Sequence, residues 1–179
     1  MFCIYQNIFS ILYPKYRESY LIKKWNDIRK IMKKYNLNIE IHKNSRTLII
    51  KNSIYTKDIY LLIKGRDFLR LVVRSVSLSI AKKIFNEGIS CCIINMDFFF
   101  KKNIKHEKNL ICKWKREYLI FKVLEFITKC YIIKRGDSIS IIGPYKNIKN
   151  LLGMINNKNK KTNHLKLLQF LSKSCIYTK

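Results

Sequence analysis

The first half of the chain changes its hydrophobic period within a few residues. Over 16–35 the apolar positions recur at spacings of four, three, four and three residues, which predicts one amphipathic helix. Its apolar stripe consists of Leu21, Trp25, Ile28, Met32 and Tyr35. Strict alternation over 37–42 then predicts a strand buried on one face. A polar turn at 43–45 leads into a second strand over 46–51, so we expect a hairpin.

Three further elements are predicted before the middle of the chain. A helix is expected over 65–75, and its inward residues are Phe68, Leu69, Val72 and Val76. A second helix over 78–86 stops before Gly88, a residue type that commonly ends helices. Residues 89–96 form a short continuous apolar run, which is typical of a buried strand.

An amphipathic helix is predicted again over 117–129. Its apolar side is expected to consist of Leu119, Val123, Phe126 and Ile127. Lys122, Glu125 and Lys129 lie on the other side, so Glu125 is expected to pair with one of the two lysines.

The second half ends with a hairpin and a helix. Strands over 130–134 and 138–142 flank a turn that contains Gly136, and a helix follows over 146–156. The basic tail, residues 158–179, has room for one short helix.

The order helix, strand, strand, helix therefore occurs twice, near residues 16–75 and 117–156. This repeat predicts an α+β fold with two small units in tandem, each a short antiparallel sheet covered on one face by helices. We place the first unit at residues 1–86 and the second at 87–157, followed by the tail at 158–179.

The charge of the chain points to a polyanionic partner. The 179 residues contain 37 basic and 11 acidic side chains, so the formal net charge is +26. Such a charge fits nucleic acid first and an anionic membrane surface second. However, lysine, isoleucine and asparagine all have codons rich in A and T, and lysine outnumbers arginine 29 to 8. An AT-rich genome would produce much of this excess, so the positions of the charges carry more information than their sum.

The sequence has few features that indicate membrane insertion, disulfide bonds or catalysis. No run of about 18 apolar residues occurs, so we expect no membrane partner. The six cysteines lack CxxC spacing, which favours a reducing compartment and predicts no metal site. The three histidines are His42, His106 and His164, all in polar or lysine-rich surroundings, and no nucleotide-binding or hydrolase motif occurs. We therefore predict that the chain is not an enzyme and uses neither a cofactor nor a small-molecule substrate.

One basic stretch contains aromatic residues at close intervals. Over 98–116 seven cations alternate with Phe98–Phe100 and Trp114, and the only acid is Glu107. Cations neutralise phosphates and aromatic rings stack on unpaired bases, so this mixture suits single-stranded RNA. A lysine-rich solvated loop is the alternative. The predicted RNA-binding residues here are Lys101, Lys102, Lys105, Lys108, Lys113, Trp114, Lys115 and Arg116, and farther along the chain Lys122, Lys134 and Arg135.

Three segments, in order, resemble one protein family. Residues 13–21 read YPKYRESYL, similar to the F-P-K-Y-R-E-x-Y-L opening of the KRR-motif small-subunit processome component, a KH-domain ribosome assembly protein. Residues 64–76 read KGRDFLRLVVRSV, similar to its K-A-R-D-L-I-K-L-L-A-R-S-V helix. Residues 130–145 begin CYII and end IIGPY, similar to its C-Y-I-M to I-G-P-F hairpin.

The resemblance implies two tandem KH units. It implies that the first is a degenerate KH unit that works through protein contacts and that the second faces RNA. It also implies a nuclear and nucleolar protein that acts with pre-ribosomal RNA and other processome proteins in maturing the 18S rRNA. The chain looks like a divergent and shortened member, because the family's glycine-containing L-[IV]-G-P-x-G loop has no counterpart in residues 105–118.

We therefore expect a non-enzymatic RNA-binding assembly factor of the small ribosomal subunit. Two alternatives stay open. The chain could be a protein-binding scaffold in pre-ribosomes that has lost direct RNA contact, which the missing glycine loop favours. It could also be a related KH assembly factor of the partner-of-Nob type.

Overall fold

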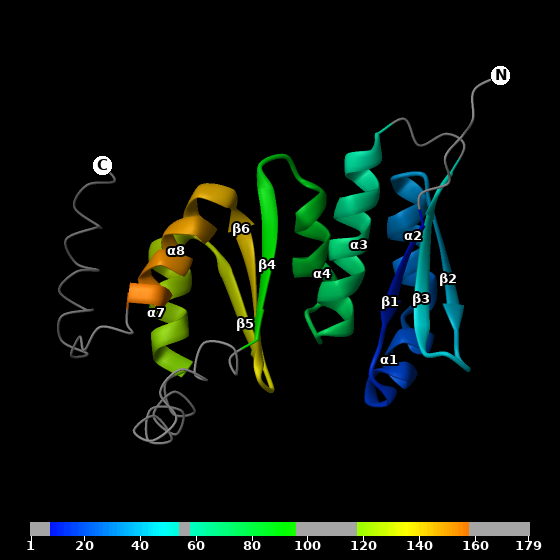
Figure 1. The fold of residues 1–179 in the computed structure, drawn as a ribbon, viewed down its shortest axis with the longest axis horizontal. Helices are drawn as coiled ribbons and strands as arrows, with labels where there is room; N and C mark the ends of the chain where they lie inside the picture. Colours follow the sequence, from blue (N-terminus) through cyan, green and yellow to red (C-terminus); the bar gives the residue numbers. More distant parts are fainter. Residues whose placement is uncertain (1–7, 54–57, 96–117, 158–179) are drawn as a thin grey trace. The chain divides into compact units, whose positions relative to one another are not determined.

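The computed structural model describes residues 8–53, 58–95 and 118–157, and the side chains of 118–120 and 154–157 are outside that description. The chain divides into two compact units, Met1–Ile89 and Ser90–Lys179. Each unit contains a three-stranded sheet with helices packed against it (Figure 1). The α+β class and the one-sided covering of each sheet agree with the sequence prediction. The helix expected in the tail lies outside the described residues.

The first unit has three strands on which helices pack. In chain order its elements are β1 (Ile8–Leu12), the 3-10 helix η1 (Lys15–Arg17), α1 (Glu18–Lys23), α2 (Trp25–Lys34), β2 (Leu37–His42), β3 (Thr47–Asn52), α3 (Ile59–Val73), α4 (Leu78–Ala81) and the 3-10 helix η2 (Lys82–Phe85). β3 lies in the centre of the sheet and pairs antiparallel with β1 and with β2. The β2–β3 hairpin has the expected position.

The helix predicted over 16–35 is wrong as a single element. A 3-10 turn precedes α1. The helix is then interrupted at Lys24, whose φ of −99° and ψ of 10° lie outside the helical range. Leu21 and Ile28, on opposite sides of the break, are both fully buried. The apolar stripe is therefore continuous in the core although the helix that carries it is not.

Strand β1 and the first turns of α3 are absent from the sequence prediction. β1 has apolar residues on both faces, since Ile11 is buried while Ile8 and Leu12 are exposed, so it shows no alternation. α3 begins at Ile59 rather than at residue 65, and the Asp58 carboxylate caps it by accepting a hydrogen bond from the backbone N–H of Tyr60 at 2.8 Å.

The core of the first unit lies between the sheet and the helices. α2 packs on β2, while α3 packs on β1 and β3. The fully buried side chains include Leu21, Ile28, Met32, Leu37, Leu48, Ile50, Leu62, Phe68 and Leu71. At the far end of α3 the Arg17 Nη2 donates to the carbonyl of Val72 at 2.8 Å, which places a cation at the negative end of the helix.

The second unit repeats the strand order of the first. Its described elements are β4 (Ile89–Asn95), α7 (Tyr118–Thr128), β5 (Tyr131–Arg135), β6 (Ser138–Pro144) and α8 (Tyr145–Asn157). The sheet order is β4-β6-β5, so the last strand in sequence is again central, as in β1-β3-β2. The tandem pattern predicted from the sequence is thus a repeat of topology.

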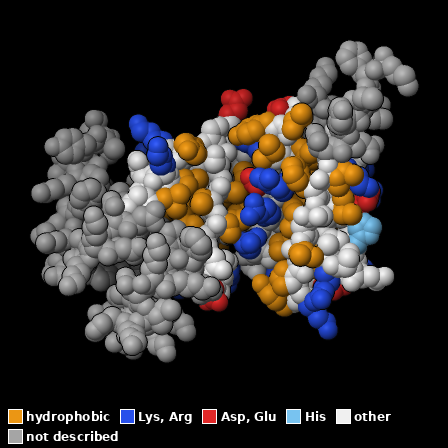
Figure 2. Space-filling view, viewed as in Figure 1, with side chains coloured by type: hydrophobic (Ala, Val, Ile, Leu, Met, Phe, Trp, Pro, Cys, Tyr) orange, Lys and Arg blue, Asp and Glu red, His pale blue; other side chains and the backbone are white. Residues whose placement is uncertain are grey.

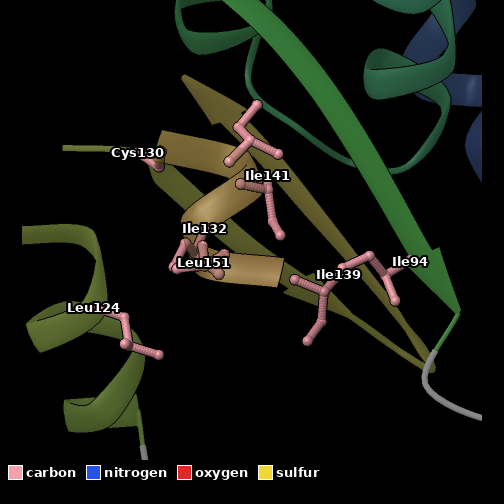
Figure 3. Packing of buried hydrophobic residues seen from close by; sticks show 8 residues of the cluster. Ile94, Leu124, Cys130, Ile132, Ile139, Ile141 and Leu151 are labelled. Atoms are coloured by element: carbon pink, nitrogen blue, oxygen red, sulfur yellow. The ribbon is translucent and has the colours of Figure 1, made fainter. Parts of the chain in front are cut away.

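The core of the second unit corrects the predicted face of α7. Leu124 is buried with Ile132, Ile139, Ile141 and Leu151, and Figure 3 shows Leu124 pointing from α7 toward the residues of the sheet. By contrast, the Phe126 side chain is 83% exposed and Val123 is 40% exposed. The prediction that both face the core is wrong, because the buried stripe of α7 is rotated toward Leu124 and Ile127.

Gly143, near the end of β6, lies too close to Cys130 for a larger residue. A Cβ atom at this position would lie 2.6 Å from Cys130 Sγ and 3.2 Å from its Cα. Such a contact is far too short, so the close approach of β6 to Cys130 requires glycine.

Candidate nucleic-acid interface

The basic stretch predicted to bind RNA lies entirely outside the described residues. This applies to Lys101, Lys102, Lys105, Lys108, Lys113, Trp114, Lys115 and Arg116. The remaining predicted residues, Lys122, Lys134 and Arg135, belong to α7 and β5 and have definite surroundings.

Lys122 forms the expected ion pair on α7. Its Nζ donates to Glu125 Oε2 at 2.8 Å. Glu125 is only 18% exposed, because its other oxygen accepts a hydrogen bond from the backbone N–H of Ile132 at 2.7 Å. The carboxylate therefore ties α7 to β5 and holds the lysine at the same time.

An exposed aromatic ring on α7 has a cation on each side of it in the sequence. Lys122 and Phe126 are four residues apart on one side of α7, and Lys129 directly follows the end of the helix with a left-handed backbone (φ 52°); all three are exposed. We call these three residues the α7 stripe. A ring flanked by two ammonium groups can stack on an unpaired base while the cations contact neighbouring phosphates. The sequence prediction included Lys122 alone, because it assigned Phe126 to the core.

Lys134 and Arg135 do not form one cluster. They are consecutive residues of β5, so their side chains leave opposite faces of the sheet. Lys134 pairs in register with the buried Ile139 and is half-buried, whereas Arg135 is exposed next to the turn. Arg135 is therefore the better placed of the two for a ligand in solution.

The first unit has a polar groove that the sequence did not reveal. The groove has a volume of about 250 Å³ and is lined by Arg29, Lys33, Leu37, Asn38, Ile39, Glu40, Lys51 and Asn52. Lys51 Nζ donates to both oxygens of Glu40 at 2.9 and 3.0 Å, and this hydrogen bond lowers the pKa of the Glu40 carboxyl. One cation is thus paired, and Arg29 and Lys33 remain as the positive side of the groove.

No catalytic constellation is apparent in the part of the chain that the structure describes. There, no group of three or more His, Cys, Asp or Glu side chains could hold a metal ion. Cys130 is buried, and burial raises the pKa of its thiol, which makes a poor nucleophile. None of the described helices is both long and apolar enough to cross a membrane.

Similar folds occur in archaeal proteins. A chain of the a/eIF2alpha–aDim2p–rRNA complex from Pyrococcus horikoshii OT3 has a TM-score of 0.79 and 21% identity, over 95% of this chain and 94% of that one. Dim2p from the same organism has a TM-score of 0.75 and 21% identity, over 93% and 99%. A protein of unknown function from Aeropyrum pernix has a TM-score of 0.80 and 14% identity, over 94% and 90%. At these identities the likeness shows a shared fold.

Family models match nearly the whole chain. Residues 7–87 match the Krr1 KH1 domain, and residues 89–168 match the second KH domain of the KRR1 small subunit processome component. Both matches are to the same family and follow its domain order. The chain therefore belongs to the Krr1 family of tandem KH-domain proteins, a family of RNA-binding ribosome assembly factors.

Proposed function

We propose that this chain is a non-enzymatic RNA-binding factor that assembles the small ribosomal subunit in the nucleolus. Its work would be the maturation of 18S rRNA in the small-subunit processome, in contact with pre-ribosomal RNA and other processome proteins. The observation that carries this proposal is the α7 stripe, in which two exposed cations flank an exposed ring in the second KH unit.

Two further observations support an RNA ligand. The second unit matches a KH domain of a processome component, and the archaeal neighbour aDim2p was crystallised in a complex with rRNA. The predicted cations at 101–116 belong to the same unit in sequence. We propose that they and the α7 stripe bind one single strand, the ring by stacking and the cations by neutralising phosphates.

A binding titration with single-stranded rRNA fragments tests the proposal. Phe126→Ala removes a ring that is 83% exposed, so the fold should not change. Stacking contributes about 1–3 kcal/mol per base, so affinity should fall roughly 5- to 150-fold. Tyr145→Ala is the matched control, since Tyr145 is a 68% exposed ring on α8 of the same unit. A chain that binds no RNA would refute the function, and equal affinity of Phe126→Ala and wild type would refute the role of the stripe.

The first unit has a feature that favours a protein partner. On the outer face of its sheet Leu12 is 75% exposed and Ile8 is 50% exposed, and both belong to the same edge strand, β1. Exposed apolar side chains gathered on one strand favour burial against another protein. We propose that the first KH unit binds a processome protein through this face.

Replacing Leu12 with Glu tests the protein contact. The variant should fold, because Leu12 is exposed, and should keep its RNA affinity while losing retention in isolated pre-ribosomes. Ser10→Glu places the same charge on the same face between the two apolar residues, so it should be retained less well than wild type but better than Leu12→Glu. Full retention of Leu12→Glu would contradict the proposed contact. If cells show no RNA cross-links to the chain while its protein partners remain bound, the scaffold alternative is correct.

A further inference from the structure

Three arginines lie in a row at α3. Arg66 and Arg70 belong to the helix and Arg74 is its C-cap residue; they are spaced by four residues, and each is half-buried at the surface edge of a helix that is otherwise largely buried. Each step of four residues advances about 6 Å along a helix, so the row is about 12 Å long. Figure 2 shows basic side chains gathered in a column over α3. We call this row the arginine stripe.

The choice of arginine is unusual in this chain. Only 8 of the 37 basic residues are arginine, whereas three of the four basic residues from 59 to 74 are arginine. Lysine has a similar helix propensity and the same charge, and AT-biased codons favour it. Arginine at three successive positions of this row therefore favours a role for the guanidinium fork, which binds oxyanions in a bidentate manner.

Neighbouring side chains orient the first two guanidinium groups. Arg66 donates from Nε to Asp67 Oδ1 at 3.0 Å, its Nη2 lies 3.0 Å from the same oxygen, and its Cζ lies 5.1 Å from the centroid of the Phe9 ring. Arg70 Nη1 lies 3.7 Å from the same carboxylate oxygen, an ion pair too long for a hydrogen bond. Arg74 Nη1 donates to the Arg70 carbonyl at 3.5 Å. A guanidinium has five N–H donors, so the contacts of Arg66 and Arg70 with Asp67 orient these two groups and leave donors for a ligand. Preorganised forks lose less side-chain entropy on binding an anion.

The arginine stripe is separate from the polar groove of the first unit. The groove is lined by residues of α2, β2 and β3, and none of the three arginines lines it. From these observations we infer that the arginine stripe binds the phosphate backbone of RNA, as a second contact in the first KH unit. This inference rests on the proposed RNA-binding function and adds a surface to it.

The row fits a polymer with regularly repeated anions. Three forks at equal intervals along one ridge of a helix match an RNA strand, in which each nucleotide carries one phosphate. An acidic protein segment is the competing ligand, and its carboxylates would occur at irregular intervals. The chain as a whole, at +26, also attracts polyanions toward any such surface.

The 179-residue chain with all three arginines changed to Gln is the test variant. Each lost phosphate contact on a single strand lowers the log–log salt slope by about 0.7, so the slope should fall by about 2. At about 0.1 M salt this corresponds to a loss of affinity of up to about 100-fold. The control variant, Lys23→Gln with Lys30→Gln and Lys34→Gln, removes the same charge from exposed positions of α1 and α2 and should change the slope less.

The outcomes separate this inference from the proposed function. If wild type binds no single-stranded RNA, both are wrong. If wild type binds and the arginine variant has an unchanged slope, only the arginine stripe is refuted. A triple Arg→Lys variant that binds like wild type would refute the role of the guanidinium fork, because lysine keeps the charge but has no fork. Tighter competition by polyglutamate than by RNA would assign the stripe to an acidic protein. Should the Gln variant not fold, RNA cross-links of the wild-type chain must map to α3, and cross-links confined to the second unit would refute the stripe.

Discussion

Gly65 lies in the middle of α3, where two opposing effects of an added methyl group can be compared. Gly65→Ala should gain about 1 kcal/mol, because alanine is the better helix former. However, the new Cβ would lie 2.6 Å from Leu37 Cδ1, 2.7 Å from Ile50 Cδ1 and 3.1 Å from Met32 Cε. Overpacking of this kind costs about 1–3 kcal/mol. The net expectation is a loss of up to about 2 kcal/mol in the free energy of unfolding.

The surroundings of Gly65 decide whether the added methyl group stabilises or destabilises the fold. Leu37, Ile50 and Met32 are each at most 1% exposed, so their tips cannot move into solvent. These three side chains fill the space that the methyl group would need.

Urea unfolding followed by circular dichroism measures the effect, with Gly153→Ala as control. Gly153 is also a helical glycine, but its Cβ would meet nothing within 4 Å, so that variant should be stabilised by about 0.5–1 kcal/mol. Ile50→Val removes the Cδ1 atom that Gly65→Ala would strike, so the double mutant should be more stable than the sum of the single effects predicts. Stabilisation by Gly65→Ala equal to that of Gly153→Ala would refute the reasoning.

Three other predictions concern polar groups that the fold encloses. Glu125→Ala should destabilise the second unit by about 1–3 kcal/mol in thermal unfolding, since the N–H of Ile132 loses its acceptor, whereas Glu125→Gln should retain most of the stability. Lys64 is buried, its Nζ donates to the Asn86 carbonyl at 2.6 Å, and desolvation lowers its pKa below 10.5. Between the lowered pKa and 10.5, Lys64 is protonated in the unfolded chain but not in the folded one. The free energy of unfolding of wild type should therefore rise relative to that of Lys64→Met as pH rises toward 10.5. An equal pH dependence of the two free energies would contradict this. Cys130 should react with iodoacetamide much more slowly in the folded chain than in urea, as measured by mass spectrometry, because burial raises the pKa of its thiol.

Periodicity predicted the fold where one face of an element is buried and the other is wet. The β2–β3 hairpin is such a case, because Ile39 is buried and Glu40 is exposed. It failed for β1, where Leu12 is apolar and exposed, since an apolar outer face removes the alternation. It also missed the break at Lys24, because neither glycine nor proline marks that position in the sequence.

The candidate site was less predictable than the fold. Lys122 could be named from charge alone, but Phe126 could not, since an aromatic residue in an amphipathic helix is ordinarily assigned to the core. A rotation of the buried stripe by one position, to Leu124, moves Phe126 into solvent. Such a rotation depends on side-chain packing between α7 and the sheet, and it cannot be predicted from the composition of the helix.

The strand order of the first unit has a consequence for its synthesis. The central strand β3 is the last of the three to leave the ribosome, and the N-terminal strand β1 pairs with β3 alone. While α1, α2 and β2 are being translated, β1 is an apolar segment without a hydrogen-bonding partner. At roughly 5–20 residues per second this interval lasts seconds, which is long compared with hairpin formation in microseconds. Before β3 emerges, β1 is therefore open to chaperones and to the wrong strands of neighbouring nascent chains.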